Sequence, residues 1–156
     1  DVPAEVVMSL AEQKAVDVAK EMPEGTVILG SDTVVAADGK ILGKPKSHEE
    51  AYEMIRRLAG RSHQVYTGVC LVKKGPEGEA DTVVSFYDET DVNVSPMTEK
   101  EIREYADSEE PMDKAGSYAV QGFFARYIDG LKGSYANVMG LPVHLVYQEL
   151  KKLGAL

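Results

Sequence analysis

The stretch that decides the fold reads HQVYTGVCLVKK at residues 63–74, GPEG at 75–78 and TVVSFYDETDVNVS at 82–95. Its two outer segments are rich in Val, Tyr, Thr and Phe, which are residues that favour extended backbone. The Gly and Pro residues between them are typical of a turn. The sequence therefore predicts two long antiparallel strands joined by a short connection.

Four helices are predicted around these strands. Residues 3–22 place apolar side chains at helical spacing. The sequences Ser47–Glu50 and Thr98–Glu101 both have the three-residue spacing of an N-terminal capping box, so each is expected to begin a helix, the first of which stops at Gly60. A last helix is predicted over residues 142–153.

The other predicted strands are short. A tight hairpin is expected at Asp38-Gly39, because both residues tolerate positive φ. Strands are expected at residues 26–30, 34–37, 41–42, 117–120 and 123–131, and a glycine-rich loop follows the last of them. No internal repeat or linker interrupts the chain. We predict one α/β domain of the mixed α+β kind over residues 1–156, with a mostly antiparallel sheet and flanking helices.

Composition excludes several classes of protein. The formal charge is −9, from 26 acidic and 17 basic side chains, so general binding to nucleic-acid backbones is not expected. The apolar runs are too short to cross a bilayer and no secretory segment is present, which predicts no membrane partner and a cytoplasmic location. The single cysteine, Cys70, allows no internal disulfide and is expected to be a buried thiol.

A polar sequence, Gly30 to Thr33, separates two apolar strand segments. We expect its carboxylate, Asp32, at a strand end, where it could act as a general base or a metal ligand. The alternative is that Asp32 or Ser31 only caps the amides of a turn.

Two lysines are candidates for contact with an anion. Lys44 projects from the stiff Gly43-Lys44-Pro45 connection and could bind a phosphate, or it could be an ordinary solvated lysine. Lys14 lies on the apolar face of the first helix, where its ammonium either enters a polar cleft or extends along the surface to water.

The segment Glu110–Gly122 is the last candidate region. It combines a turn, the charged pair Asp113-Lys114 and a predicted strand that ends in Gln121-Gly122, where an amide lies beside backbone that a ligand can approach closely. It could also be an ordinary loop. The three histidines, at positions 48, 63 and 144, lack the spacing of a metal cluster.

Several sequence motifs occur in an order that is similar to that of a known family. They are Glu12-Gln13-Lys14-Ala15, Gly30-Ser31-Asp32-Thr33-Val34-Val35, Gly43-Lys44-Pro45, Leu58-Ala59-Gly60, His63-Gln64-Val65-Tyr66-Thr67-Gly68-Val69, Glu110-Pro111-Met112-Asp113-Lys114-Ala115-Gly116 and Gly133-Ser134-Tyr135-Ala136-Asn137-Val138-Met139-Gly140-Leu141-Pro142. In this order the chain resembles the Maf family of septum-formation-type nucleotide pyrophosphatases. The resemblance implies a two-lobed fold like that of inosine triphosphate pyrophosphatases, with the nucleotide between the lobes.

The same resemblance implies a reaction and its residues. A nucleoside triphosphate would be hydrolysed to the monophosphate and pyrophosphate with help from a divalent metal, Mg²⁺ or Mn²⁺. Asp32 matches the family's proton acceptor and is also the expected metal ligand. Lys14, Lys44 and Lys114 match lysines that line the phosphate site.

Two further positions bear on base choice in the family. The subgroup acting on dTTP and UTP carries Asp-Thr and Ile-Gln-Gly, and this chain has Asp32-Thr33 and Val120-Gln121-Gly122. The subgroup acting on 7-methyl-GTP typically has Asp-Gln and Ser-Glu-Gly. Thr33 and Gln121 therefore favour dTTP and UTP, with 7-methyl-GTP as the alternative substrate.

The resemblance also suggests a departure and some wider roles. Family members begin with a strand and a Ser-x-Ser-Pro-Arg-Arg loop that do not precede Asp1, so we expect a single Maf-like domain that lacks this segment. A homodimer and roles in nucleotide-pool cleaning and cell-division arrest are also expected. The alternative function is a non-catalytic nucleotide-binding regulator of septum formation.

Overall fold

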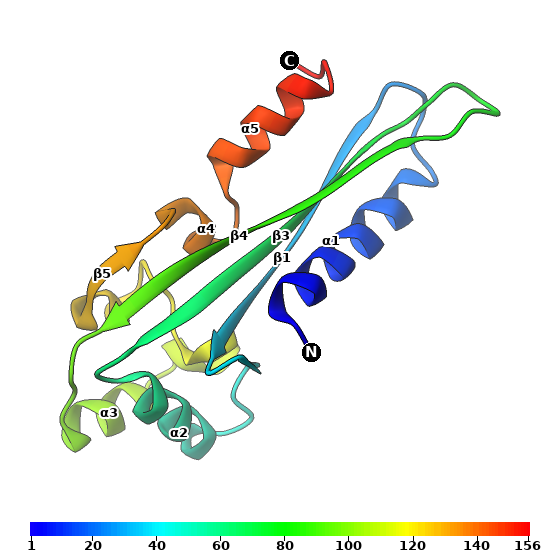
Figure 1. Ribbon diagram of the computed structural model, residues 1–156. Coiled ribbons are helices and arrows are strands. Elements are labelled where there is room, and N and C mark those ends of the chain that lie inside the picture. The colour runs from blue at the N-terminus through cyan, green and yellow to red at the C-terminus, as the bar shows by residue number, and fades with distance from the viewer.

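The computed structural model describes residues 1–156 as an antiparallel five-stranded sheet with helices packed around it (Figure 1). The strand order is β2-β1-β3-β4-β5. The strands are β1 (Val27–Ala37), β2 (Lys40–Leu42), β3 (Ser62–Lys73), β4 (Thr82–Val94) and β5 (Ile128–Lys132). The predicted α+β class, with an antiparallel sheet and flanking helices, is confirmed.

The long β3–β4 pair forms the centre of the sheet, as its sequence predicts. Its register runs from Ser62 opposite Asn93 to Lys73 opposite Thr82. Strand β1 pairs with β3 along residues 27–36, whereas it pairs with β2 only along residues 35–37. The outer edge of β1 is therefore open from residue 27 to residue 34.

The helices are α1 (Pro3–Ala19), α2 (His48–Leu58), α3 (Glu99–Ala106), α4 (Tyr135–Met139) and α5 (Val143–Lys152). Both predicted N-caps are present: the Ser47 hydroxyl accepts from the Glu50 amide at 3.1 Å, and Thr98 forms a complete capping box with Glu101. Helix α1 ends at Ala19 rather than at residue 22. The short helix α4 replaces part of the expected glycine-rich loop.

The helices cover different parts of the sheet (Figure 1). Helix α1 lies along one side of β1 and β3, α4 and α5 lie on the other side, and α2 and α3 gather at one end. Small side chains of α1, Ala11 and Ala15 among them, pack with the buried Cys70. Burial raises the pKa of the Cys70 thiol, as expected for an inert thiol. No helix has the length and apolar character that crossing a membrane requires.

Strand β1 differs from its prediction, because residues 26–30 and 34–37 belong to one continuous strand. The polar residues between them do not interrupt it: Ser31, Asp32 and Thr33 lie opposite Val69, Gly68 and Thr67 of β3. Asp32 therefore lies in the middle of a strand, and the expected strand end was wrong. Hydrogen bonds to β3 satisfy the backbone groups of these residues, so the segment stays extended although its polar composition is typical of a turn.

The predicted strand at 117–120 is also wrong. Gly116 and Ser117 both have φ of +71°, which breaks any extended run before Tyr118. Short 3₁₀ helices occupy Glu110–Asp113, Ala115–Ser117 and Phe123–Tyr127, and β5 begins only at Ile128. Gln121 consequently lies in a turn between two of these helices rather than at a strand end.

Candidate active site

Lys14 and Asp32 form an ion pair on the face of the sheet that α1 covers. The helix lies directly on two glycines: a Cβ at Gly30 would be 2.6 Å from the Ala11 carbonyl oxygen, and one at Gly68 would be 2.3 Å from backbone of α1. This close approach brings Lys14 Nζ to 2.8 Å from Asp32 Oδ1 and 3.2 Å from the Ser31 carbonyl oxygen. The Lys14 ammonium therefore meets a carboxylate, while 56% of its side chain remains exposed to water.

Thr33 faces the opposite side of the sheet. Successive strand residues point to opposite faces, and the Thr33 hydroxyl lies 2.8 Å from that of Thr67 on β3. A cavity of about 260 Å³ opens here, and Thr33, Lys114 and Gln121 are among the residues that line it. This volume lies just below the roughly 300 to 1,000 Å³ of pockets for drug-sized ligands, which suits a group with a single ring. Three sequence-predicted residues thus share one cavity.

Glu110 holds the segment that carries Gln121. Its carboxylate accepts from the backbone amides of Phe123 at 2.8 Å and Phe124 at 3.2 Å, and from the Tyr105 hydroxyl at 2.6 Å. Burial alone would raise the pKa of Glu110, but these hydrogen bonds bring that pKa below its usual value. The sequence did not predict these hydrogen bonds of Glu110, because nothing in it indicates that a carboxylate accepts from amides 13 and 14 positions away.

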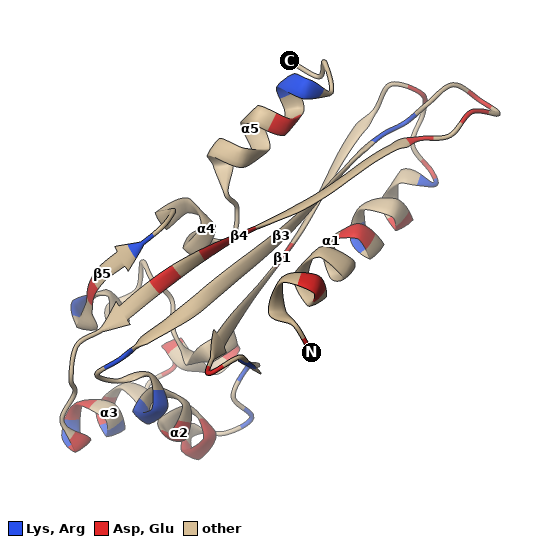
Figure 2. Ribbon diagram, viewed as in Figure 1, with Lys and Arg blue, Asp and Glu red and all other residues tan.

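Lys44 and Lys114 come together although the chain separates them widely. The amide of Gly116 donates to the carbonyl oxygen of Gly43 at 3.1 Å, which joins the two segments. Lys114 Nζ bonds Asp113 Oδ1 at 2.8 Å, and this bond, with a smaller effect from Lys44, holds the pKa of Asp113 below its usual range. Figure 2 shows basic residues on the loop between β2 and α2. Both cations lie near a single carboxylate.

The sheet separates the predicted residues into two groups, with Lys14 and Asp32 on one face and Thr33, Lys114 and Gln121 on the other. Asp32 and Thr33 themselves lie in the part of β1 whose outer edge is open, because β2 covers only residues 35–37. A ligand could therefore place a ring in the cavity on one face and extend anionic groups across this edge to the other.

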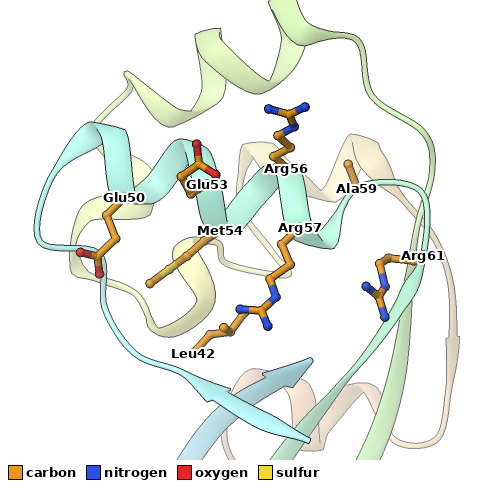
Figure 3. A pocket seen from close by; sticks show the side chains of 8 residues that line it. All are labelled: Leu42, Glu50, Glu53, Met54, Arg56, Arg57, Ala59 and Arg61. Carbon is orange, nitrogen blue, oxygen red and sulfur yellow. The ribbon is translucent and has the colours of Figure 1, made fainter. Parts of the chain in front are cut away.

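A larger cavity, of about 670 Å³, lies elsewhere, between α2 and the β1–β2 hairpin (Figure 3). Arg57 and Arg61 point into it, whereas Arg56 points toward α3 and pairs with Glu99 at 3.9 Å. Arg61 is paired with Asp38. Glutamates line the same cavity, so its charge is mixed, and it contains none of the sequence-predicted site residues.

No group of three or more His, Cys, Asp or Glu side chains is arranged to hold a metal ion. Asp32 is the single carboxylate among the site residues, and its Oδ1 is bonded to Lys14. Magnesium is commonly held by one or two carboxylates together with substrate phosphates and water. Asp32 is thus compatible with a metal that arrives with a triphosphate, but the protein alone does not form a cage for one.

His63 contacts a residue of the cavity wall, since its Nε2 lies 2.6 Å from the hydroxyl of the cavity-lining Tyr118. His63 is fully buried, and burial, with a smaller effect from the charge of Arg61, lowers its pKa from 6.5 to about 4. The His63 imidazole therefore takes up a proton at a higher pH in the unfolded chain than in the folded chain. We expect the free energy of unfolding to fall by up to about 3 kcal/mol as the pH drops from 6.5 to 4.

Urea unfolding at several pH values in this interval measures the effect. His63→Gln should remove most of the pH dependence, whereas the matched change at the exposed His144, His144→Gln, should retain it. If the two variants lose stability equally as the pH falls, the titration of His63 is not the cause.

Comparison with known proteins identifies the family. A family model described as Maf-like protein matches residues 1–153. Relatives from Lachnoclostridium phytofermentans and Agathobacter rectalis are each 47% identical over 97% of this chain, which covers 77% and 80% of their lengths. One from Bacillus cytotoxicus is 46% identical over 96% of this chain and 75% of its own length. All three are named dTTP/UTP pyrophosphatase. Because the match extends over almost all of its residues, the chain belongs to the Maf family.

Proposed function

We propose that this protein is a nucleoside triphosphate pyrophosphatase that hydrolyses dTTP and UTP to the monophosphate and pyrophosphate. The observation that carries the proposal is the cavity that Thr33, Gln121 and Lys114 share, next to the strand edge where Lys14 and Asp32 meet. Relatives that share 46–47% of their residues with this chain bear the same activity in their names.

In this proposal the cavity takes the base. The Gln121 amide can donate to a carbonyl of uracil or thymine and can accept from N3–H, so both halves of the side chain serve one ring edge. Purines are rejected by size, because the cavity suits a single ring. Thr33 and Gln121 also distinguish this chain from the 7-methyl-GTP subgroup.

The triphosphate extends across the open edge of β1. Lys14, Lys44 and Lys114 are proposed to stabilise the charge that develops on the departing pyrophosphate. Asp32 accepts the proton of the attacking water, using the oxygen that is not bonded to Lys14. Lys114 exchanges its resting partner, Asp113, for a phosphate oxygen.

Asp32 is also the proposed ligand for a divalent cation, Mg²⁺ or Mn²⁺, bound together with the substrate phosphates. Such an ion would reduce the charge repulsion between the triphosphate and its attacking water. The lysines and Asp32 perform the remaining functions: they bind, orient and accept a proton.

The wider proposal includes the two-lobed arrangement. The end of the sheet that packs with α2 and α3 would form one lobe, and the side covered by α1 would form the other. In support, the apolar side chains of these two regions form two different buried clusters. A homodimer, a cytoplasmic location and roles in nucleotide-pool cleaning or cell-division arrest also belong to the proposal.

Pyrophosphate release from dTTP, UTP, CTP, ATP, GTP and 7-methyl-GTP, with Mg²⁺ or Mn²⁺, tests the function. We expect turnover of dTTP and UTP to exceed that of the purine nucleotides. The assay is run on this chain and on a longer version that carries the family's N-terminal strand and Ser-x-Ser-Pro-Arg-Arg loop. Saturable binding without pyrophosphate release in both versions would favour the non-catalytic regulator.

Gln121→Glu tests base choice separately. A carboxylate cannot donate to a ring carbonyl, so the preference for dTTP and UTP should decrease selectively, while the lysines and Asp32 remain unchanged. Glu109→Gln, at a position outside the cavity, is the control and should keep the preference. Equal turnover of all nucleotides by the unmodified protein would reject the subgroup assignment and leave the pyrophosphatase assignment standing.

A further inference from the structure

The cavity between α2 and the β1–β2 hairpin has basic side chains at one end (Figure 3). Arg57, in the last turn of α2, and Arg61, just before β3, both point into it. Glu50, in the first turn of α2, lies at the opposite end in this view. The charges of the cavity are therefore separated, and two guanidinium groups form its basic end.

A single carboxylate, that of Asp38 in the hairpin, pairs with the basic end. Asp38 accepts a hydrogen bond from Arg61. This bond, with smaller effects from the charges of Arg57 and Lys40, holds the pKa of Asp38 below its usual range. One negative charge thus faces three positive charges, so the basic end can accept a further anion.

Arg57 has no acidic partner of its own. Its neighbour Arg56 pairs with Glu99 at 3.9 Å, whereas none of the ion pairs in the protein includes Arg57. Both arginines lie in the last turn of α2, where the helix dipole favours positive charge. The dipole therefore does not explain why Arg57 points into the cavity and Arg56 points away from it. An unpaired guanidinium presents a planar set of N–H donors that matches the oxygens of a phosphate group.

The cavity has room for more than an inorganic ion. Its volume of about 670 Å³ lies within the roughly 300 to 1,000 Å³ of small-molecule sites. Leu42, Met54 and Ala59 also line it, and they offer apolar surface beside the charged groups. A long polyanion would be repelled by the formal charge of −9, but a small anion interacts mainly with the nearby cations. These features favour a small phosphorylated molecule over a nucleic acid.

We propose that this cavity is a second anion site, which binds the phosphate of a small phosphate monoester through Arg57 and Arg61. The organic part of the ester would lie against Leu42 and Met54. Free phosphate would use the same guanidinium groups but leave the apolar wall uncovered, so it should bind more weakly. The inference does not depend on the proposed function, because Lys14, Asp32 and the other residues of that site do not line this cavity.

Phenyl phosphate and inorganic phosphate are the probes. Nuclear magnetic resonance of backbone amides follows their binding and separates the amides of α2 and the β1–β2 hairpin from those near Gln121. Phenyl phosphate should shift the first group of amides and bind there roughly tenfold more tightly than phosphate, because its ring buries apolar surface. Shifts confined to the amides near Gln121 would overturn the proposal.

Arg57→Gln should weaken the binding of phenyl phosphate at α2 by about tenfold or more, the loss expected for a hydrogen bond to a charged group. Arg56→Gln is the matched control, since it removes the same charge from the same turn of the helix. Its dissociation constant should equal that of the unmodified protein. Equal weakening by the two variants would show a general effect of charge and overturn the site.

Asp38→Asn should change the affinity in the opposite direction. Asparagine removes the competing charge, keeps an oxygen that can accept from Arg61 and tolerates the φ of +53° at this position. Binding should strengthen by about two- to fivefold, the scale of an exposed ion pair. Unchanged or weaker binding in folded Asp38→Asn would contradict the proposal. Tighter binding of polyglutamate than of phenyl phosphate at the same amides would point to an acidic protein partner and overturn it as well.

Discussion

Asp32→Asn is expected to lower kcat for UTP by about 100-fold or more, the loss typical of a missing general base. Asparagine keeps the size of the side chain and an oxygen for Lys14, but its amide cannot take a proton from water. Folding should survive, because the Asp32 side chain is 21% exposed and its partner Lys14 is 56% exposed. An ion pair of this exposure contributes at most about 1 kcal/mol. Steady-state kinetics of pyrophosphate release measures the effect.

The control is Asp17→Asn, which removes a carboxylate from the same side of the molecule. Asp17 is 81% exposed and pairs only with Lys20, at 3.6 Å. Its kinetics should match those of the unmodified protein. Activity of Asp32→Asn within a few-fold of the parent would reject Asp32 as the base, even if the lysine site stands.

Lys44→Ala and Lys114→Ala should each weaken transition-state binding by about 2 to 4 kcal/mol, or roughly 30- to 1,000-fold in kcat/KM. The reason is that each ammonium would meet charge that grows on the leaving pyrophosphate. Their main effect should therefore be on kcat rather than on KM. Lys114 has a carboxylate partner in the resting protein, so its loss also leaves Asp113 without that ion pair.

Lys46→Ala is the matched control for these changes, because Lys46 is exposed and follows Pro45 on the same loop as Lys44. It should alter kcat/KM less than twofold, as expected for a solvated lysine. Ordinary kinetics in both Lys44→Ala and Lys114→Ala would remove the phosphate site from the mechanism.

Local signals in the sequence predicted the elements whose causes lie within a few residues. The two helix caps at Ser47 and Thr98 and the Asp38-Gly39 hairpin are confirmed, since each depends on neighbours three or fewer positions away. The β3–β4 pair is confirmed because strongly β-forming residues fill both strands.

The errors share a physical cause. The polar run at residues 30–33 has the composition of a turn, but pairing with β3 keeps it in the strand. The segment near Gln121 has the composition of a strand, but the positive φ of Gly116 and Ser117 breaks it. The carboxylate of Glu110 then accepts hydrogen bonds from the backbone amides of Phe123 and Phe124, just after Gln121. In both places a distant partner outweighs local propensity.

By itself, the sequence determined the α+β class, the order of most elements and the residues to suspect: Lys14, Asp32, Thr33, Lys44, Lys114 and Gln121. Only the tertiary structure decided how these residues group. Lys14 meets Asp32 across 18 positions because the missing side chains of Gly30 and Gly68 let α1 lie on the sheet. Alternation along β1 then sends Thr33 to the opposite face, toward Gln121. Neither the close approach of α1 nor the meeting of Thr33 and Gln121 at one cavity is encoded locally, because both depend on atoms that only the packing of separate elements brings together.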